Sequence, residues 1–407
     1  MSKLQPVRGT HDLFLEEAEK FRHIVKSAAE LSKLYCFGEI QTPIFEFTEV
    51  FKRTLGETSD VVNKEMYTFE DRGNESLTLR PEFTAGIARA FISNGLAQHL
   101  PLKFFSSGPL FRYERPQKGR QRQFHQVNFE WLGEKEPYAD VELIMLAKSL
   151  LEKIEIKNFK LHINSLGDKE SRENYRNKLV EYFSQFKDKL SEDSKLRLEK
   201  NPLRILDSKN EGDKEIVKNA PKIFDSFTKE AKEFFDKVKS GLTALNIEFI
   251  ENPKIVRGLD YYNHTVFEFI SEAEEMGAQN TILAGGRYDN LIKTMGGPET
   301  PAVGFAAGIE RLMLSIPQPK NEGELVAIMP LGDAATEAAM VFALWQRHKL
   351  NKPAQVIFGG NLKKKLHKAD AMKATQAIII GDNEIKEGIY ILKDMKTGKE
   401  EKLKFEM

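Results

Sequence analysis

The chain has 407 residues, enough for two or three domains. Its 61 Lys and Arg residues balance 61 Asp and Glu residues, which excludes a histone-like polycation and means that any nucleic-acid contact must come from local patches. Charged residues make up 30% and hydrophobic residues 41%, as in ordinary folded proteins, and the single cysteine, Cys36, excludes an internal disulfide.

The first 22 residues mix acidic and basic side chains, which predicts neither a secretory signal nor a transit peptide. No stretch reaches the roughly 20 apolar residues of a membrane span, so we expect a cytoplasmic protein without membrane contact. Apolar residues then recur at helical spacing, at Phe14, Ala18, Phe21, Val25 and Ala28. This spacing predicts a helix that ends at Gly38. A short strand with Pro43 follows, and the proline favours a sheet edge or an interface.

Residues 102–132 are expected to form two strands around a basic loop. Strict alternation in the second strand separates two faces, with Gln126, Asn128 and Glu130 on one and Val127, Phe129 and Trp131 on the other. One face should therefore pack in the core, while the other carries amides and a carboxylate.

Long charged helices after Gly167 predict a helical insertion over about residues 168–250. Strands return at residues 255–270 and 281–284, with a glycine pair at 285–286, and the first domain is expected to end at residue 316. Residues 317–323 resemble a linker. Strands predicted at residues 325–329, 355–358 and 376–380 alternate with helices near residues 334–350 and 362–373, so residues 324–407 are expected to form a small α/β domain.

Three arginine-containing segments are candidates for chemistry, at residues 111–120, 256–262 and 304–312. Arginines hold phosphate oxygens bidentately, and Glu114 could accept from an amino group such as that of adenine. Arg257 could neutralise developing negative charge. Taken singly, each segment also fits an ordinary structural role: a solvated hairpin tip, tyrosines packed on a strand, and a close-packed helix with a surface arginine.

In combination, the three segments resemble those of class II aminoacyl-tRNA synthetases. The helix and strand ending at Pro43 resemble the first class II motif, residues 111–130 the second and residues 304–312 the third. Residues 78–86, 257–262 and 284–289 are further similar to the histidyl enzymes of that class. The resemblance implies an α+β catalytic domain, with an antiparallel sheet, flanking helices and a helical insertion, followed by an α/β anticodon-binding domain.

The resemblance also implies where histidine binds. Its α-amino group would meet Glu82, Thr84 and Gln126, while Glu130, Tyr262 and Tyr288 would surround the imidazole. A carboxylate and a phenol can pair both ring nitrogens, so an analogue that lacks one would leave a buried polar group unmatched. The chain departs from the family's form of the first segment, which has glycine where this chain has Phe83.

For ATP, the resemblance implies contacts from five residues, and it implies Mg²⁺ carried by ATP with no dedicated protein metal site. Arg112 would hold the α-phosphate, Glu114 the adenine amino group and Phe124 the adenine ring, with Arg120 and Arg311 toward the outer phosphates. Arg257 and Arg112 would be the catalytic residues. The implied reaction converts histidine and ATP to histidyl-adenylate and pyrophosphate and then transfers histidine to tRNA(His).

The resemblance further implies a homodimer formed through the helix and strand that end near Pro43. In the C-terminal domain, residues 361–366 open a lysine-rich helix that suits phosphate contacts, although a lysine-rich face is usually only solvated.

Two alternatives remain open from the residues. One is a non-catalytic paralogue, such as the regulatory subunit of a histidine-biosynthetic phosphoribosyltransferase; the arginines at 112, 257 and 311 and the C-terminal domain count against it. The other is a class II synthetase for another small amino acid, which residues 257–262 together with Glu130 disfavour.

Overall fold

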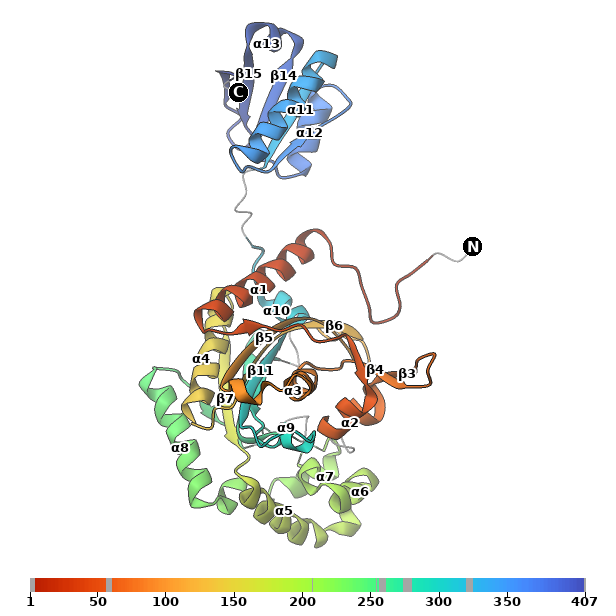
Figure 1. Ribbon diagram of the computed structural model, residues 1–407, viewed down its shortest axis with the longest axis vertical. Coiled ribbons are helices and arrows are strands. Elements are labelled where there is room, and N and C mark those ends of the chain that lie inside the picture. Colours follow the sequence, from red (N-terminus) through yellow and green to blue (C-terminus); the bar gives the residue numbers. More distant parts are fainter. Residues whose placement is uncertain are drawn as a thin grey trace. The chain divides into compact units, whose positions relative to one another are not determined.

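The computed structural model describes residues 4–55, 61–206, 208–253, 255, 261–273, 280–319 and 325–405. The chain divides into two compact units, Met1–Pro319 and Lys320–Met407, which are described separately (Figure 1). None of the described helices has both the length and the apolar character that crossing a membrane requires.

The first unit is built on an eight-stranded sheet. From edge to edge its strands are β1 (Gly38–Glu39), β5 (Leu102–Phe111), β6 (Gln123–Leu132), β11 (Ala302–Gly308), β10 (Thr281–Arg287), β9 (Asn263–Ser271), β7 (Phe159–Ser165) and β8 (Ile250–Glu251). The short edge strands pair in parallel and the six central strands are antiparallel. A separate antiparallel sheet joins β2 (Phe45–Phe47), β4 (Ser76–Leu79) and β3 (Tyr67–Glu70).

Strand β6 shows how the sequence sets the two faces of the sheet. Val127 and Phe129 are fully buried, and the Phe129 ring lies 5.0 Å from the ring of Phe305 on the neighbouring strand. The alternation predicted from the sequence is present, but Asn128 and Glu130 on the polar face are buried as well. This face therefore lines an internal cavity.

Helices cover both faces of the sheet (Figure 1). The apolar core on one face includes side chains from α1 (Leu15–Leu34), α4 (Tyr138–Lys153), α8 (Lys229–Ala244) and α10 (Ile309–Ser315). A second core gathers α3 (Thr84–Ser93), α5 (Lys169–Ser184) and α9 (Leu291–Thr294). Short elements complete this unit: α2 (Thr48–Leu55), η1 (Val61–Glu65) and η2 (Leu96–His99).

The helical insertion begins with α5 and continues through η3 (Lys187–Lys189), α6 (Glu192–Lys200), η4 (Pro202–Ile205), α7 (Glu211–Val217) and η5 (Ile223–Ser226) to α8. Helix α8 belongs to the main core, since Phe235, Val238 and Leu242 pack there together with residues of α4. Helix α5 ends at Ser184 and buries Tyr175, Leu179 and Phe183 along one face.

Three local predictions were wrong at element ends. Helix α1 ends at Leu34, and Cys36, with φ of 61°, turns the chain before Gly38, which lies in β1. Pro43 lies between β1 and β2, so the single expected strand is two strands in different sheets. The glycine pair lies inside β10, since strands on both sides approach closely: a Cβ on Gly285 would lie 2.3 Å from the carbonyl oxygen of Gly304.

The second unit has the strand order β13 (Ala354–Val356), β12 (Val326–Leu331), β14 (Gln376–Gly381), β15 (Ile389–Asp394) and β16 (Glu400–Lys404). Helices α11 (Asp333–His348), α12 (Leu362–Ala371) and α13 (Asp382–Glu387) accompany them. The sequence predicted three of these strands and missed β15 and β16, whose side chains are at most half-buried. In the lysine-rich helix, Lys365 is buried and donates to the carbonyl of Pro330, so it is not a phosphate-facing lysine.

Candidate functional site

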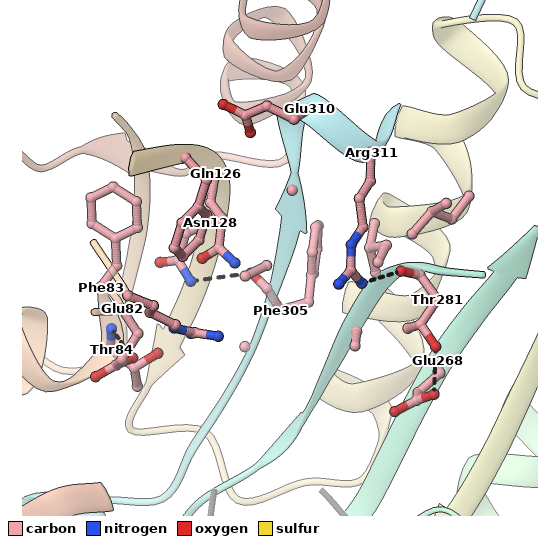
Figure 2. A pocket seen from close by; sticks show the side chains of 18 of the residues that line it. Glu82, Phe83, Thr84, Gln126, Asn128, Glu268, Thr281, Phe305, Glu310 and Arg311 are labelled. Carbon is pink, nitrogen blue, oxygen red and sulfur yellow. Dashed lines mark hydrogen bonds between the residues drawn. The ribbon is translucent and has the colours of Figure 1, made fainter. Parts of the chain in front are cut away.

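A cavity of about 310 Å³ opens on the polar face of the large sheet (Figure 2). It is bounded by the β5–β6 hairpin, the N-terminus of α3, strands β9 to β11 and the start of α10. The residues expected to form the site line this one cavity, namely Glu82, Thr84, Arg112, Glu114, Arg120, Phe124, Gln126, Glu130, Tyr262, Tyr288 and Arg311. Arg257 lies outside the described residues.

Glu82 is held against the first turn of α3. Its carboxylate accepts from the backbone N–H groups of Thr84 at 2.7 Å and Ala85 at 2.6 Å, which are donors that the helix itself leaves unpaired. Burial raises the pKa of Glu82 more than these hydrogen bonds lower it. Phe83 has an ordinary φ of −90°, and the Arg80 guanidinium lies 4.5 Å from its ring, so this turn does not require glycine.

Glu130 is the polar centre of the inner part of the cavity. It accepts from the Thr84 hydroxyl at 2.5 Å, from the Asn128 amide at 2.9 Å and from the Tyr288 hydroxyl. Burial raises the pKa of Glu130 to about 7, against the opposing effect of these donors. Gly304 makes room for the carboxylate, since a Cβ there would lie 1.6 Å from Oε2 of Glu130.

Three tyrosines form the wall beside Glu130. The rings of Tyr261 and Tyr262 are 4.6 Å apart, and that of Tyr288 lies 5.6 Å and 6.4 Å from them, respectively. Burial, with the nearby negative charge of Glu130, raises the pKa of Tyr288 well above its ordinary value. The hydroxyl of Tyr288 is therefore a proton-bearing donor.

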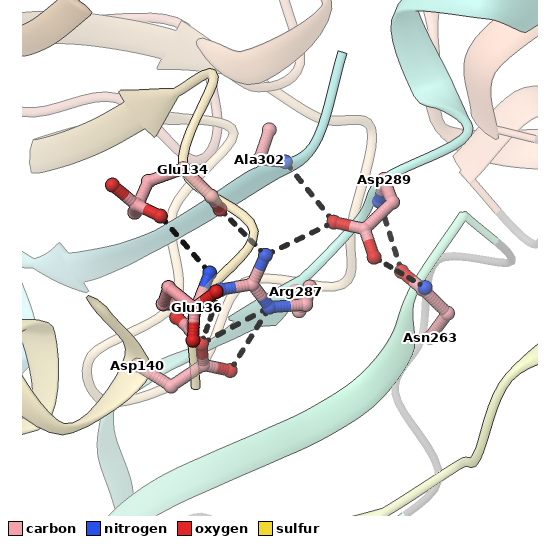
Figure 3. A network of polar contacts seen from close by, with 7 residues as sticks. All are labelled: Glu134, Glu136, Asp140, Asn263, Arg287, Asp289 and Ala302. Atoms are coloured by element: carbon pink, nitrogen blue, oxygen red, sulfur yellow. Dashed lines mark hydrogen bonds and ion pairs between the residues drawn. The ribbon is translucent and has the colours of Figure 1, made fainter. Parts of the chain in front are cut away.

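A buried ion-pair network surrounds Arg287, the last residue of β10, which directly precedes Tyr288 in the chain (Figure 3). The Arg287 guanidinium donates to Asp140 of α4 and, at 3.2 Å, to Asp289. Asp289 in turn accepts from Asn263 at 2.9 Å and from the backbone N–H of Ala302 at 3.1 Å. Burial lowers the pKa of Arg287, but the two carboxylates outweigh it and raise that pKa above its ordinary value. Residues of β9, β10, β11 and α4 are thus joined around the position that precedes Tyr288.

Arginines dominate the other part of the cavity. Arg112 donates to the carbonyl of Pro81 at 2.9 Å and lies 5.2 Å from the ring of Phe124. Glu114 lies between two guanidinium groups, 2.9 Å from Nε of Arg120 and 3.9 Å from Arg112. These side chains form a cationic surface suited to a polyanion.

Arg311 completes this surface from α10 and donates to the carbonyl of Thr281 at 2.7 Å. Burial lowers the pKa of Arg311, and the neighbouring Arg120 guanidinium lowers it further. Gly119, with φ of 71°, lets the hairpin tip approach Arg311, since a Cβ there would be 3.2 Å from its side chain.

Sequence reasoning did not assign several residues that line or support the site. Asn128 was placed on the polar face without a role, and among the described residues its Oδ1 has no hydrogen-bond partner. Glu310 accepts from the backbone and ring nitrogens of His125, at 2.9 Å and 2.8 Å, and so joins α10 to β6. Glu268 accepts from Thr281 at 3.0 Å, a pair that only the register of β9 and β10 brings together.

The sheet and its two-part cavity define the catalytic domain of a class II aminoacyl-tRNA synthetase. The model of the histidyl-tRNA synthetase family matches residues 9–312, and that of the anticodon-binding domain matches residues 326–407. The chain belongs to the histidyl-tRNA synthetase family.

Individual relatives agree with this assignment. A histidine–tRNA ligase of Wolbachia pipientis is 53% identical over 97% of this chain and 96% of its own length. The structure of apo histidyl-tRNA synthetase from S. aureus, 33% identical, superposes with a TM-score of 0.84 over 99% of this chain and 97% of that one.

A Bacillus halodurans protein described as an ATP phosphoribosyltransferase regulatory subunit/histidyl-tRNA synthetase shares the fold. It is 20% identical, with a TM-score of 0.67 over 94% of this chain and 99% of that one. At this identity the match shows that the two proteins share a fold.

Proposed function

We propose that the chain is a histidine–tRNA ligase. It would convert histidine and ATP to histidyl-adenylate and pyrophosphate and then transfer histidine to the 3′ end of tRNA(His). The observation that carries this proposal is one cavity with two chemically different parts. Glu130 and the tyrosines suit an imidazole, while Arg112, Arg120 and Arg311 suit a triphosphate.

We assign the histidine contacts to the inner part. Glu130, Tyr262 and Tyr288 would surround the imidazole, and a carboxylate beside phenol groups can match both ring nitrogens. Glu82, Thr84 and Gln126 would meet the α-amino group. Two observations support this assignment: these side chains line the same cavity, and Glu82 and Glu130 are buried. An amino acid without matching polar groups would therefore bind without hydrogen bonds to these buried carboxylates.

We assign the ATP contacts to the arginine-rich part, with Arg112 on the α-phosphate, Phe124 on the adenine ring and Arg120 with Arg311 toward the outer phosphates. Glu114 would accept from the adenine amino group, although without a ligand it pairs with Arg120. It would therefore have to exchange partners on binding.

The first chemical step forms a bond between a carboxylate oxygen of histidine and the α-phosphorus. The bond from that phosphorus to the bridging oxygen breaks, and pyrophosphate leaves with the electron pair. In the second step the terminal ribose hydroxyl of tRNA attacks the carbonyl carbon of the adenylate, AMP departs, and the hydroxyl proton is released. Catalysis rests on bringing two anions together and on spreading charge over Arg112 and, from its motif, Arg257.

Mg²⁺ would enter with ATP as part of the substrate. Among the described residues no group of three or more His, Cys, Asp or Glu side chains has the arrangement of a metal site, whereas Glu268 and Glu310 do line the cavity. Magnesium commonly combines one or two carboxylates with substrate phosphates, so these residues fit the ion of Mg–ATP.

We propose a domain division into a catalytic domain over residues 1–316, with the insertion over about 168–250, a linker over 317–323 and an anticodon-binding domain over 324–407. The matched ranges and the two compact units support it.

We place the reaction in the cytoplasm, where tRNA charging supplies translation; fractionation of cells with an antibody against the chain tests this.

We further propose a homodimer formed around Pro43. Support comes from exposed apolar side chains on and beside the three-stranded sheet that follows it, namely Ile44, Phe45, Phe47, Phe69 and Tyr113. Light scattering after size exclusion should give the mass of two chains, and Phe47→Glu should shift it toward one.

Pyrophosphate exchange with Mg–ATP and each of the twenty amino acids tests the activity without tRNA. Exchange with histidine alone is the expected result. Exchange with another amino acid would point to a different class II specificity, and silence with all twenty from folded protein would favour the regulatory paralogue.

A further inference from the structure

The first helix of the insertion reaches the back of the tyrosine wall. Arg172, in the first turn of α5, donates from its guanidinium to the backbone carbonyl of Tyr262 at 2.9 Å. Tyr262 is one of the residues that we assign to the imidazole, so this inference rests on the proposed function. Arg172 does not line the cavity, and its contact with Tyr262 is to the main chain.

Hydrogen bonds to the N-terminus of α8 anchor the N-terminus of α5, which carries Arg172. Asp168 caps α5 by accepting from the backbone N–H of Ser171 at 2.7 Å, and it also accepts from the hydroxyl of Thr228, the N-cap residue of α8. The backbone N–H of Thr228 donates to the hydroxyl of Ser171 at 2.9 Å. Because α8 packs in the main core, these bonds fasten the start of α5 to the body of the domain.

The main chain that receives Arg172 adopts an unusual path. His264, two residues after Tyr262, has φ of 45°, a left-handed conformation that costs energy for any residue except glycine. Backbone bonds to the two residues that precede the insertion hold it there: Leu166 donates to His264 at 2.7 Å, and His264 donates to Gly167 at 2.8 Å. On the other side, Asn263 is bonded to Asp289 of the buried network. The backbone conformation around His264 therefore depends on these hydrogen bonds to neighbouring segments.

We propose that Arg172 is a positioning residue for Tyr262, through which the helical insertion sets the affinity of the site for histidine. The arginine supplies the hydrogen bond on the pocket side of the strained residue, where the backbone bonds of Leu166 and Gly167 do not reach. Loss of that bond frees the Tyr262 main chain to shift and moves its ring relative to Tyr288. The arginines that we assign to ATP lie on other elements and are unaffected.

The test is the kinetics of histidine-dependent pyrophosphate exchange in the full chain. Arg172→Ala should raise KM for histidine by about tenfold, the effect of losing one charge-assisted hydrogen bond, and change kcat and KM for ATP by less than about twofold. Arg172→Lys should recover most of the affinity, since an ammonium can still donate. Arg176→Ala is the matched control, because Arg176 lies one turn further along α5 and is exposed.

A histidine KM within about twofold of the parent would overturn the proposal, as would a parallel rise in KM for ATP, which indicates a general structural effect. If circular dichroism shows that Arg172→Ala is unfolded, Arg172→Lys and Arg172→Gln decide instead, and equal histidine KM values in the parent and both variants would refute the positioning role. A parent protein without histidine-dependent exchange would overturn the proposed function itself, and this inference with it.

Discussion

The hydroxyl of Thr84 lies 2.5 Å from Oε1 of Glu130 and donates to it. The two residues come from the first turn of α3 and from β6, and we assign them to opposite ends of the histidine substrate. They are already joined without a ligand. The amino end and the imidazole end of the pocket therefore share one hydrogen-bond network, and a change at either residue should affect the other.

Glu130 should make histidine binding depend on pH. Burial raises the pKa of Glu130 to about 7, so the group is mostly protonated at pH 6 and mostly ionised at pH 8. An ionised carboxylate is the stronger acceptor for an imidazole N–H, so affinity for histidine should rise by up to about tenfold over this range.

Glu130→Gln separates this effect from the ionisation of histidine itself. Calorimetry should show weaker histidine binding with ATP binding intact, and the ratio of parent to variant affinity should increase from pH 6 to pH 8. A constant ratio would contradict the titration of Glu130, and equal losses for both ligands would indicate a structural role.

Arg257→Ala should slow adenylate formation by orders of magnitude with a modest effect on histidine binding, because its charge would act on negative charge that develops in the transition state. Rapid-quench measurement of a single turnover checks this. An unchanged single-turnover rate would remove Arg257 from the catalytic residues.

Gly304→Ala should damage the histidine site selectively. The added methyl group would overlap the Glu130 carboxylate, 1.6 Å from Oε2, and force it out of its network. We expect KM for histidine to rise by at least about tenfold, as when one charge-assisted hydrogen bond is lost. Gly38→Ala in β1 is the control, since its nearest atom would be 3.8 Å away. Similar exchange kinetics in both variants would show that Glu130 is not placed by Gly304.

Removal of residues 320–407 should abolish charging of tRNA while slowing adenylate formation much less, because the cavity is built entirely from the first unit. Aminoacylation and pyrophosphate exchange are measured on the same preparation. Parallel losses in the two assays would refute this division of labour.

Much of the first unit follows from local sequence pattern. The alternation in residues 123–132 predicted the strand and its two faces, because a strand repeats every two residues regardless of its partners. Element ends were less predictable: Gly38 looked like a helix stop, yet Cys36 makes the turn. Strands β15 and β16 were missed because neither has the buried apolar run that identified β12 and β14.

The site residues were chosen by resemblance, and their assembly in one cavity depends on contacts that pattern cannot supply. Nothing in the local sequence links Asp140 to Arg287, which are 147 residues apart. The register that pairs β9 with β10 likewise decides that Thr281 meets Glu268. Asn128 could have been found, since it lies between Gln126 and Glu130 on the same face of one strand.

The buried Arg287–Asp140 ion pair couples formation of the pocket to folding of the first unit. Both side chains are withdrawn from water, and a buried charge without its partner costs several kcal/mol, roughly half of a typical domain's stability. A partly assembled state, with β10 in the sheet but α4 undocked, would bear that cost in full. The tyrosine wall and the part of the first unit that surrounds it should therefore form and melt in a single cooperative transition.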